Sequence, residues 1–138
     1  QTCALPILSY KLNDFEFKKK HTFEKRELEA YTMITKHPGK VPVVCEISKR
    51  DERSDFVLDK NKYLVPNEIS VGQFMHVIRK RINLAPEDAI FMFINNTIQP
   101  NSALMGQVYK EQKDKDLFLY ALICRETTFG DSNLNCCL

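Results

Sequence analysis

Apolar residues recur with helical spacing near the start of the chain, over residues 13–37. Phe23, Ala30 and Ile34 stand at positions i, i+7 and i+11, so a helix would carry all three on one face. A Pro-Gly pair at 38–39 stops this segment. We therefore expect residues 13–37 to form an N-terminal helical subdomain made of two helical pieces.

The segment SVGQFMHVIRKRI, residues 70–82, has the clearest helical pattern in the chain. Ser70 and Gln73 have the spacing of a capping box, in which each side chain bonds the backbone amide of the other residue. The apolar stripe of the segment has i, i+4, i+8 spacing and consists of Phe74, Ile78 and Ile82.

Four segments are rich in β-branched and other apolar residues, a composition that indicates strands. They are residues 41–47, 61–69, 89–96 and 116–124. Pro66 cannot donate a ladder hydrogen bond, so we expect the second segment to be an edge strand or Pro66 to mark the end of the strand. The last segment, DLFLYALIC, is almost wholly apolar, which favours a central strand buried on both faces.

The order of these elements predicts the fold class. The helical pieces are followed by β, β, α, β, α, β, where the second helix of this run extends from Ser102 to Tyr109. Such an order is typical of an α+β fold of the β-grasp type, a mixed sheet packed on helices. The strand patterns predict a four-stranded sheet, and the order is also compatible with a fifth strand.

The bulk composition is that of one globular domain. The 138 residues are 43% hydrophobic and 28% charged, and a net charge of +2 is too small to indicate nucleic-acid binding. No apolar run approaches the roughly 18 residues of a membrane-spanning helix. The five cysteines are odd in number and include no C-x-x-C pair, so we expect a reducing, intracellular setting.

The first residues, QTCALPI, can be back-translated into a nucleotide string that resembles a common sequencing-library adapter. We therefore expect residues 1–8 to be a non-native artefact and exclude them from the fold. With these residues excluded, the native domain would begin at residue 9. The alternative is that residues 1–8 are a genuine N-terminal segment.

No arrangement of residues indicates an enzyme or a metal site. The three histidines form no H-E-x-x-H motif, and the four glycines are too dispersed for a phosphate loop. Asp114 and Asp116 belong to a polar turn, and Cys136-Cys137 cannot complete a zinc shell. Cys45 and Cys124 lie in strand patterns and are expected in the core. We expect no catalytic residue, no metal and no bound cofactor.

Two basic clusters invite a different interpretation. One lies at Lys18–Lys20 and extends to Lys25 and Arg26, and the other is Arg79–Arg81. A solvated helix face is the simpler reading of the first cluster. A nucleic-acid-binding surface is the alternative, and the small net charge and the lack of an aromatic platform argue against it.

Four long motifs occur in order: HTFEKRELEA, KYLVPNEISVGQFMHVIRKRI, EDAIFMFINNTIQPNSALMGQVYKE and DLFLYALICRETTFG. Together they resemble the ubiquitin-like modifiers of autophagy, the GABARAP-like and microtubule-associated light-chain-like proteins. The resemblance runs from about Phe15 to Gly130. It implies a ubiquitin fold with two added N-terminal helices.

The resemblance also implies a function for the C-terminus. A cysteine protease would cut after Gly130 and remove a propeptide, residues 131–138, leaving a modifier domain of residues 9–130. Activating and conjugating enzymes would then pass the glycine carboxylate through thioesters to the amine of phosphatidylethanolamine, the covalent lipid. Glycine lacks a Cβ and fits a narrow active-site channel, which the adjacent Phe129 would help to grip.

This expected modifier is a non-enzyme that works through its partners. We expect a cytoplasmic monomer before lipidation, and a protein of autophagosome and vesicle membranes after it. Cargo receptors with an aromatic-x-x-aliphatic motif would add a strand to the edge strand at 62–65. An interaction adaptor that is never conjugated is the alternative, with Gly130 a simple turn residue.

The resemblance implies two pockets along that edge strand. The aromatic side chain of the motif would bind a pocket lined by Glu29, Met33, Pro42, Lys60, Lys62, Leu64 and Phe118. The aliphatic side chain would bind a pocket lined by Tyr63, Val65, Pro66, Ile69, Phe74 and Val77. Lys40 and Arg81, with Lys60 and Lys62, would attract acidic residues that flank the motif. Phe74 as a pure core residue and Lys60 as a solvated one are alternatives.

The chain departs from the family pattern at two positions near these pockets. The loop between Glu46 and Tyr63 is longer and more charged than we expect. Lys40 stands where arginine is usual, so bidentate pairing with a carboxylate is lost there.

Overall fold

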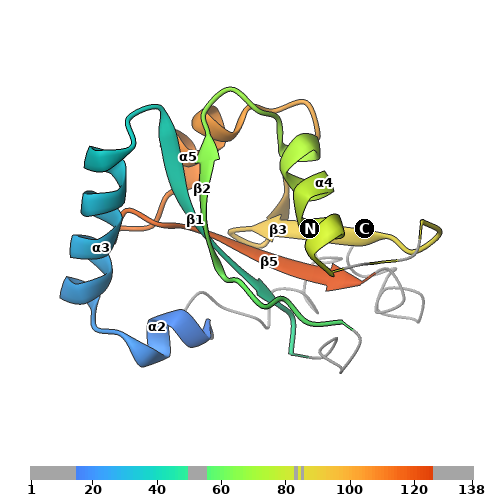
Figure 1. Ribbon diagram of the computed structural model, residues 1–138, viewed down its shortest axis with the longest axis horizontal. Coiled ribbons are helices and arrows are strands. Elements are labelled where there is room, and N and C mark those ends of the chain that lie inside the picture. The colour runs from blue at the N-terminus through green and yellow to red at the C-terminus, as the bar shows by residue number, and fades with distance from the viewer. Residues whose placement is uncertain (1–14, 50–55, 83, 85, 126–138) are drawn as a thin grey trace.

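The computed structural model describes residues 15–49, 56–82, 84 and 86–125, which form a mixed sheet with helices on both faces (Figure 1). The strands are β1 (Lys40–Ile47), β2 (Lys62–Pro66), β3 (Ile90–Ile94), β4 (Thr97–Ile98) and β5 (Leu119–Arg125). Their order across the sheet is β2-β1-β5-β3-β4. Among the described strands, β1 and β5 run parallel, and the pairs β1–β2, β3–β5 and β3–β4 are antiparallel.

The sheet has five strands within the described residues, so the expectation of four is wrong. The additional strand, β4, is only two residues long and pairs with the end of β3. Asn95 and Asn96, between the two strands, both have positive φ angles of 52° and 63°. Such a pair forms the tight hairpin turn that lets the chain reverse at once. The strand pattern over residues 89–96 did not indicate the short strand that follows.

The N-terminal segment forms two helices, as expected: α2 (Glu16–Lys20) and α3 (Phe23–Lys36). The Thr22 hydroxyl caps α3 by accepting from the amide of Lys25 at 3.2 Å. On the predicted apolar face, Ala30 is completely buried but Phe23 remains 38% exposed. Residues 13 and 14 lie outside the described residues.

The remaining helices are α4 (Val71–Ile82) and α5 (Met105–Gln112). The capping box of α4 is confirmed, because the Ser70 amide donates to Gln73 Oε1 at 2.8 Å and the Gln73 amide donates to Ser70 Oγ at 3.1 Å. The predicted start of α5 at Ser102 is wrong. The preceding backbone instead bonds the beginning of α4, where the Val71 amide donates to the carbonyl of Ala103 at 2.8 Å.

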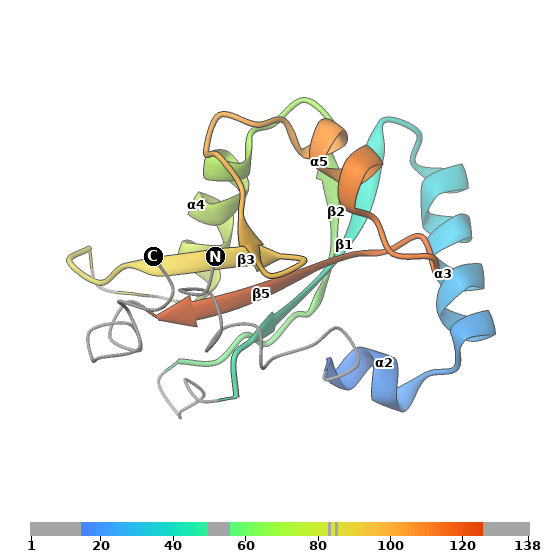
Figure 2. The same ribbon diagram turned by 180° about the vertical axis from the view of Figure 1, so that it is seen from behind.

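Two apolar cores lie on opposite faces of the sheet, with α4 on one side and α2 and α3 on the other (Figures 1 and 2). The α4 stripe of Phe74, Ile78 and Ile82 packs into the first core. Six consecutive residues of β5 are buried, which confirms a central strand covered on both faces. Cys45 and Cys124 are both buried in the apolar cores, as expected. None of the helices in the described part of the chain is long and apolar enough to cross a bilayer.

Candidate functional site: the edge strand and its two flanks

Strand β2 lies at the edge of the sheet, which confirms the position indicated by Pro66. Its inner side pairs with β1 in a register that sets Tyr63 opposite Val43 and Leu64 opposite Pro42. Its outer side has no strand neighbour within the described residues. The backbone amides and carbonyls on that side can therefore accept one more strand.

Alternation along β2 sends its side chains to two different flanks. Tyr63 and Val65 are buried in the core beneath α4. Lys62 and Leu64 are half-buried and point to the opposite face, which α3 covers. A peptide added to this strand would alternate in the same way, so its side chains would meet both flanks.

The α3 flank brings together most of the residues predicted for the aromatic pocket. Glu29 of α3 forms an ion pair with Lys62 of β2, and Met33 packs on the core of this face. Pro42 and Phe118 are buried, so they can form only the floor of such a pocket. Both side chains of the Glu29–Lys62 pair are half-buried and still reach solvent. A pair at the surface is worth about 0–1 kcal/mol, so an incoming acidic group can displace it at little cost.

The α4 flank contains the residues predicted for the aliphatic pocket, at different depths. Tyr63, Val65 and Phe74 are all in the core, and the Tyr63 and Phe74 rings meet edge to face with centroids 5.7 Å apart. Ile69 is partly buried against them, whereas Val77 is 44% exposed. The alternative reading of Phe74 as a core residue therefore fits the structure.

The surface of this flank is hollowed beside Val77. A hollow of about 400 Å³ is lined by Asp59, His76, Val77, Lys80 and Arg81. Pro66 ends β2 opposite Lys40 and, by alternation, falls on the side of Lys62 and Leu64. Its contribution to an aliphatic pocket stays a prediction.

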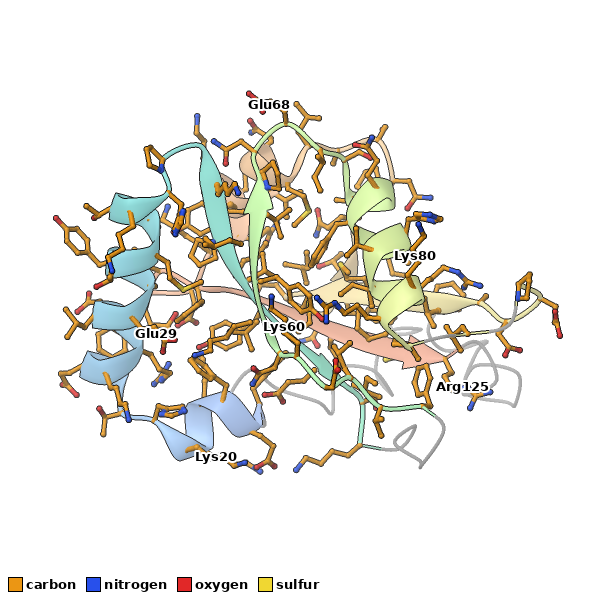
Figure 3. The ribbon with its side chains drawn as sticks, in the orientation of Figure 1. Lys20, Glu29, Lys60, Glu68, Lys80 and Arg125 are labelled. Atoms are coloured by element: carbon orange, nitrogen blue, oxygen red, sulfur yellow. The ribbon has the colours of Figure 1, made fainter. Side chains whose placement is uncertain are left out.

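Cations stand at both ends of β2. Lys60 Nζ lies 5.4 Å from the centre of the Tyr63 ring, and the Arg81 guanidinium carbon lies 6.0 Å from it. Lys60 lies just before β2, and Lys80 marks the neighbouring part of α4 (Figure 3). Lys40 is exposed at the other end of the strand, opposite Pro66. Acidic residues on either side of a bound motif would thus meet positive charge.

The Tyr63 hydroxyl is a feature that the sequence did not indicate. It is buried and has no hydrogen-bond partner among the described residues. Burial raises the pKa of Tyr63 to about 12, an effect that the nearby Arg81 partly offsets. The phenol is therefore neutral at physiological pH and retains an unused hydrogen-bonding group.

A buried carboxylate holds the α3 flank in place, which corrects the assignment of Asp116 to a simple polar turn. Asp116 is completely buried and accepts from Arg26 Nη1 and from the Tyr120 hydroxyl, each at 2.5 Å. It also accepts from the amide of Phe118 at 2.9 Å. Arg26 belongs to α3 and Tyr120 to β5, so this one carboxylate ties the helix to the centre of the sheet.

The first basic cluster is only partly a solvated face. Lys18 pairs with Asp114 at 3.0 Å and lies 4.8 Å from the centre of the Tyr120 ring. Arg26 bonds Asp116, as above, while Lys19 and Lys20 are exposed. Two of these cations therefore attach the N-terminal helices to the turn before β5. Their charges are already paired, which lowers the charge available for nucleic acid.

A second carboxylate holds α2. Both oxygens of Glu46, on β1, accept from the first turn of this helix, from the amides of Glu16 and Phe17 at 2.9 Å each. Burial raises the pKa of Glu46, and these two hydrogen bonds act in the opposite direction. The carboxylates of Asp116 and Glu46 thus hold in place the two helices that form one wall of the site.

Several predicted residues lie outside the described part of the chain. These are Phe129, Gly130 and Cys136-Cys137, together with the propeptide and residues 1–8. Residues 50–55 of the longer charged loop are also outside it. Among the described residues there is no group of three or more side chains suited to hold a metal ion.

The sheet with α4 across one face, a free edge strand and an N-terminal helical layer define a ubiquitin-like protein. The family model of the ubiquitin-like autophagy protein Atg8 matches residues 25–130. Autophagy-related protein 8 of Emericella nidulans is 50% identical over 117 residues, which cover 84% of this chain and 97% of that relative. The Neurospora crassa protein of the same name is also 50% identical, over 94% of its length.

A solved structure is similar as well. The crystal structure of Trypanosoma brucei ATG8 superimposes with a TM-score of 0.75 and 41% sequence identity, over 82% of this chain and 96% of that one. The chain therefore belongs to the Atg8 family of ubiquitin-like autophagy proteins. The family and the fold class expected from the sequence motifs are confirmed.

Proposed function

We propose that this chain is a modifier that is conjugated through the carboxylate of Gly130 to phosphatidylethanolamine, and that it acts in autophagosome formation. The observation that carries this proposal is that the match to the family model ends at residue 130. That residue is the glycine of TTFG, and residues 131–138 continue beyond it. A match that ends at a glycine is in line with processing after that residue.

The chemistry proceeds in three steps, all performed by partner enzymes. A cysteine protease hydrolyses the peptide bond after Gly130 and releases residues 131–138. An activating enzyme uses ATP to convert the free glycine carboxylate into an acyl adenylate, with release of pyrophosphate. Its thiol then displaces AMP to form a thioester, and the thiol of a conjugating enzyme takes over the glycine carbonyl by thioester exchange. The lipid amine attacks this carbonyl, an amide forms and the enzyme thiol leaves. The diacyl lipid supplies two chains, about the number of anchoring signals that stable membrane attachment takes.

The edge strand β2 supports docking as the second half of the function. Its free outer edge can pair with an extended peptide, and the flanks differ in character. The α3 flank offers Met33 and Leu64 beside the Glu29–Lys62 pair, which suits an aromatic side chain. The α4 flank offers Val77 beside its hollow, which suits an aliphatic side chain. Cargo receptors with an aromatic-x-x-aliphatic motif are the proposed partners.

This mechanism implies two locations. Before conjugation the protein is cytoplasmic, and after it the protein is held on autophagosome and vesicle membranes by its lipid.

An adaptor that binds partners but is never conjugated is the alternative. It is favoured by one observation, because every residue of the two flanks lies within the described domain and none depends on the C-terminal segment. In that case Gly130 would be an ordinary turn residue, and starvation would produce no lipidated form.

The deciding experiment compares Gly130→Ala with a matched variant in the segment to be removed. Gly130→Ala should abolish both the cleavage of the tail and the mobility shift of the lipidated form on gels. The control, Cys136→Ser with Cys137→Ser, should leave both unchanged, because these residues are lost at the first step. Normal lipidation of Gly130→Ala would overturn the proposal and favour the adaptor.

A further inference from the structure

The outward face of α3 carries an apolar surface that the edge strand does not use. Glu24, Glu27, Leu28 and Tyr31 have i, i+3, i+4, i+7 spacing and so share one side of the helix. Leu28 is 67% exposed and Tyr31 60% exposed. With Leu117 they line a hollow of about 410 Å³. Helix α3 lies at the outside of the molecule in both views (Figures 1 and 2).

Hydrogen bonds fix the backbone of Leu117, which forms one wall of this hollow. Leu117 has a φ of 75°, a left-handed conformation that is strained for a leucine and persists only where the surroundings enforce it. Its amide donates to the carbonyl of Asp114 at 3.0 Å, and its carbonyl accepts from the Tyr109 hydroxyl at 2.8 Å. The neighbouring Asp116 bonds Arg26 on α3. A preformed surface loses little conformational entropy when it binds a partner.

The charge of the hollow determines which partner fits. Its lining contains two carboxylates, Glu24 and Glu27, and no basic side chain. Neither glutamate forms an ion pair with any residue that the structure describes. Anionic lipid headgroups would be repelled, whereas lysine or arginine would be attracted. Leu28, Tyr31 and Leu117 would at the same time accept an apolar side chain.

We propose that this α3 face is a second docking site, which binds a segment of a partner protein with an aliphatic side chain flanked by lysine or arginine. The site is separate from the edge strand, because Glu29 and Met33 occupy the other side of α3. It needs neither Gly130 nor the lipid. If no partner binds this α3 face, the proposed function is therefore unaffected.

A displayed library of random 12-residue peptides tests the proposal. Peptides are selected on the full chain and counter-selected on the variant Leu28→Ser with Tyr31→Ser. Both positions are exposed, so this variant should fold normally, as circular dichroism can verify. We expect the retained peptides to combine an aliphatic residue with lysine or arginine. Their affinity should fall at least about tenfold on the counter-selection variant, as for a buried anchor in an interface.

Two further variants separate the apolar and the charged contributions. Glu24→Lys with Glu27→Lys should also weaken these peptides about tenfold or more, and added salt should weaken binding to the native chain. The control, Ile98→Ser with Leu104→Ser, removes two comparably exposed apolar residues elsewhere and should have no effect. Retained peptides without basic residues, or binding that survives the charge reversal, would overturn the proposal. So would dimerisation of the native chain that Leu28→Ser abolishes, because the occupant would then be a second copy.

Discussion

Removing the buried carboxylate of Asp116 should destabilise the protein more than any substitution of an exposed acid. In Asp116→Ala, the Arg26 guanidinium loses its partner, although its side chain is only 11% exposed. The Tyr120 hydroxyl and the Phe118 amide lose their acceptor as well. Breaking a buried ion pair by removing one member costs about 3–5 kcal/mol.

That cost is large compared with the stability of a domain, about 5–15 kcal/mol. The midpoint of thermal unfolding should therefore fall by roughly 10 °C or more. Urea unfolding followed by circular dichroism gives the free energy of unfolding directly. The matched control is Glu111→Ala, an exposed acid on α5 whose side chain accepts, among the described residues, a hydrogen bond from Gln107. It should change the free energy of unfolding by less than about 0.5 kcal/mol.

The loss of stability in Asp116→Ala should also be confined to one part of the fold. Asp116 ties α3 to β5, so hydrogen exchange should accelerate in α2 and α3 before it does so in α4. Combining Asp116→Ala with Arg26→Met should cost less than the two single changes added together, by at least about 1 kcal/mol, because the two residues share one interaction. A loss below about 1 kcal/mol for Asp116→Ala, or strict additivity of the two changes, would show that Asp116 does not hold α3 on the sheet.

Three further predictions concern single residues. Burial raises the folded-state pKa of Glu46 above its ordinary value of 4.5, so its contribution to stability is present below that pH and is lost as the pH rises through the folded-state pKa. Urea unfolding should show that the free energy of unfolding of the unsubstituted protein falls relative to that of Glu46→Gln as the pH rises from about 4 to about 7. A difference between the two proteins that stays constant with pH would contradict this. Gly39 has a φ of 89° and open space around it, so Gly39→Ala should cost about 1–2 kcal/mol in unfolding free energy from backbone strain alone. Val77→Asp should weaken an aromatic-x-x-aliphatic peptide at least about tenfold by calorimetry with an unchanged unfolding midpoint, because Val77 is exposed beside the hollow on α4.

The parts of the fold that the sequence predicts correctly depend on local pattern. The capping box at Ser70 and Gln73 specifies the start of α4, and the i, i+4, i+8 stripe specifies its buried face. Pro66 indicates an edge strand because it cannot donate to a ladder. The run of buried residues in β5 indicates the central strand. These are properties of a few neighbouring residues, and they do not depend on the rest of the chain.

The parts that it misses depend on contacts between distant segments. Strand β4 is two residues long and forms only because β3 lies beside it. Helix α5 begins late because its leading residues bond the start of α4. Asp116 looks like a turn residue in KEQKDKD, and its burial depends on Arg26, 90 residues away in sequence. No local pattern carries that information.

The sequence likewise named some residues of the candidate site and missed others. The resemblance named the residues on both flanks of β2, and strand alternation separates Lys62 and Leu64 from Tyr63 and Val65. It could not decide whether Phe74 lines a pocket or fills the core, because α4 can present the residue at either depth. The exposed Leu28 and Tyr31 were missed, because a helical pattern alone does not show which apolar residues remain uncovered.

Mass spectrometry of the C-terminal peptide, from protein isolated from membranes, tests the central claim most directly. We expect a chain that ends at Gly130, with the glycine carboxylate joined in an amide to the amine of phosphatidylethanolamine. A membrane-bound chain that retains residues 131–138, or one that ends at Gly130 with a free carboxylate, would contradict it.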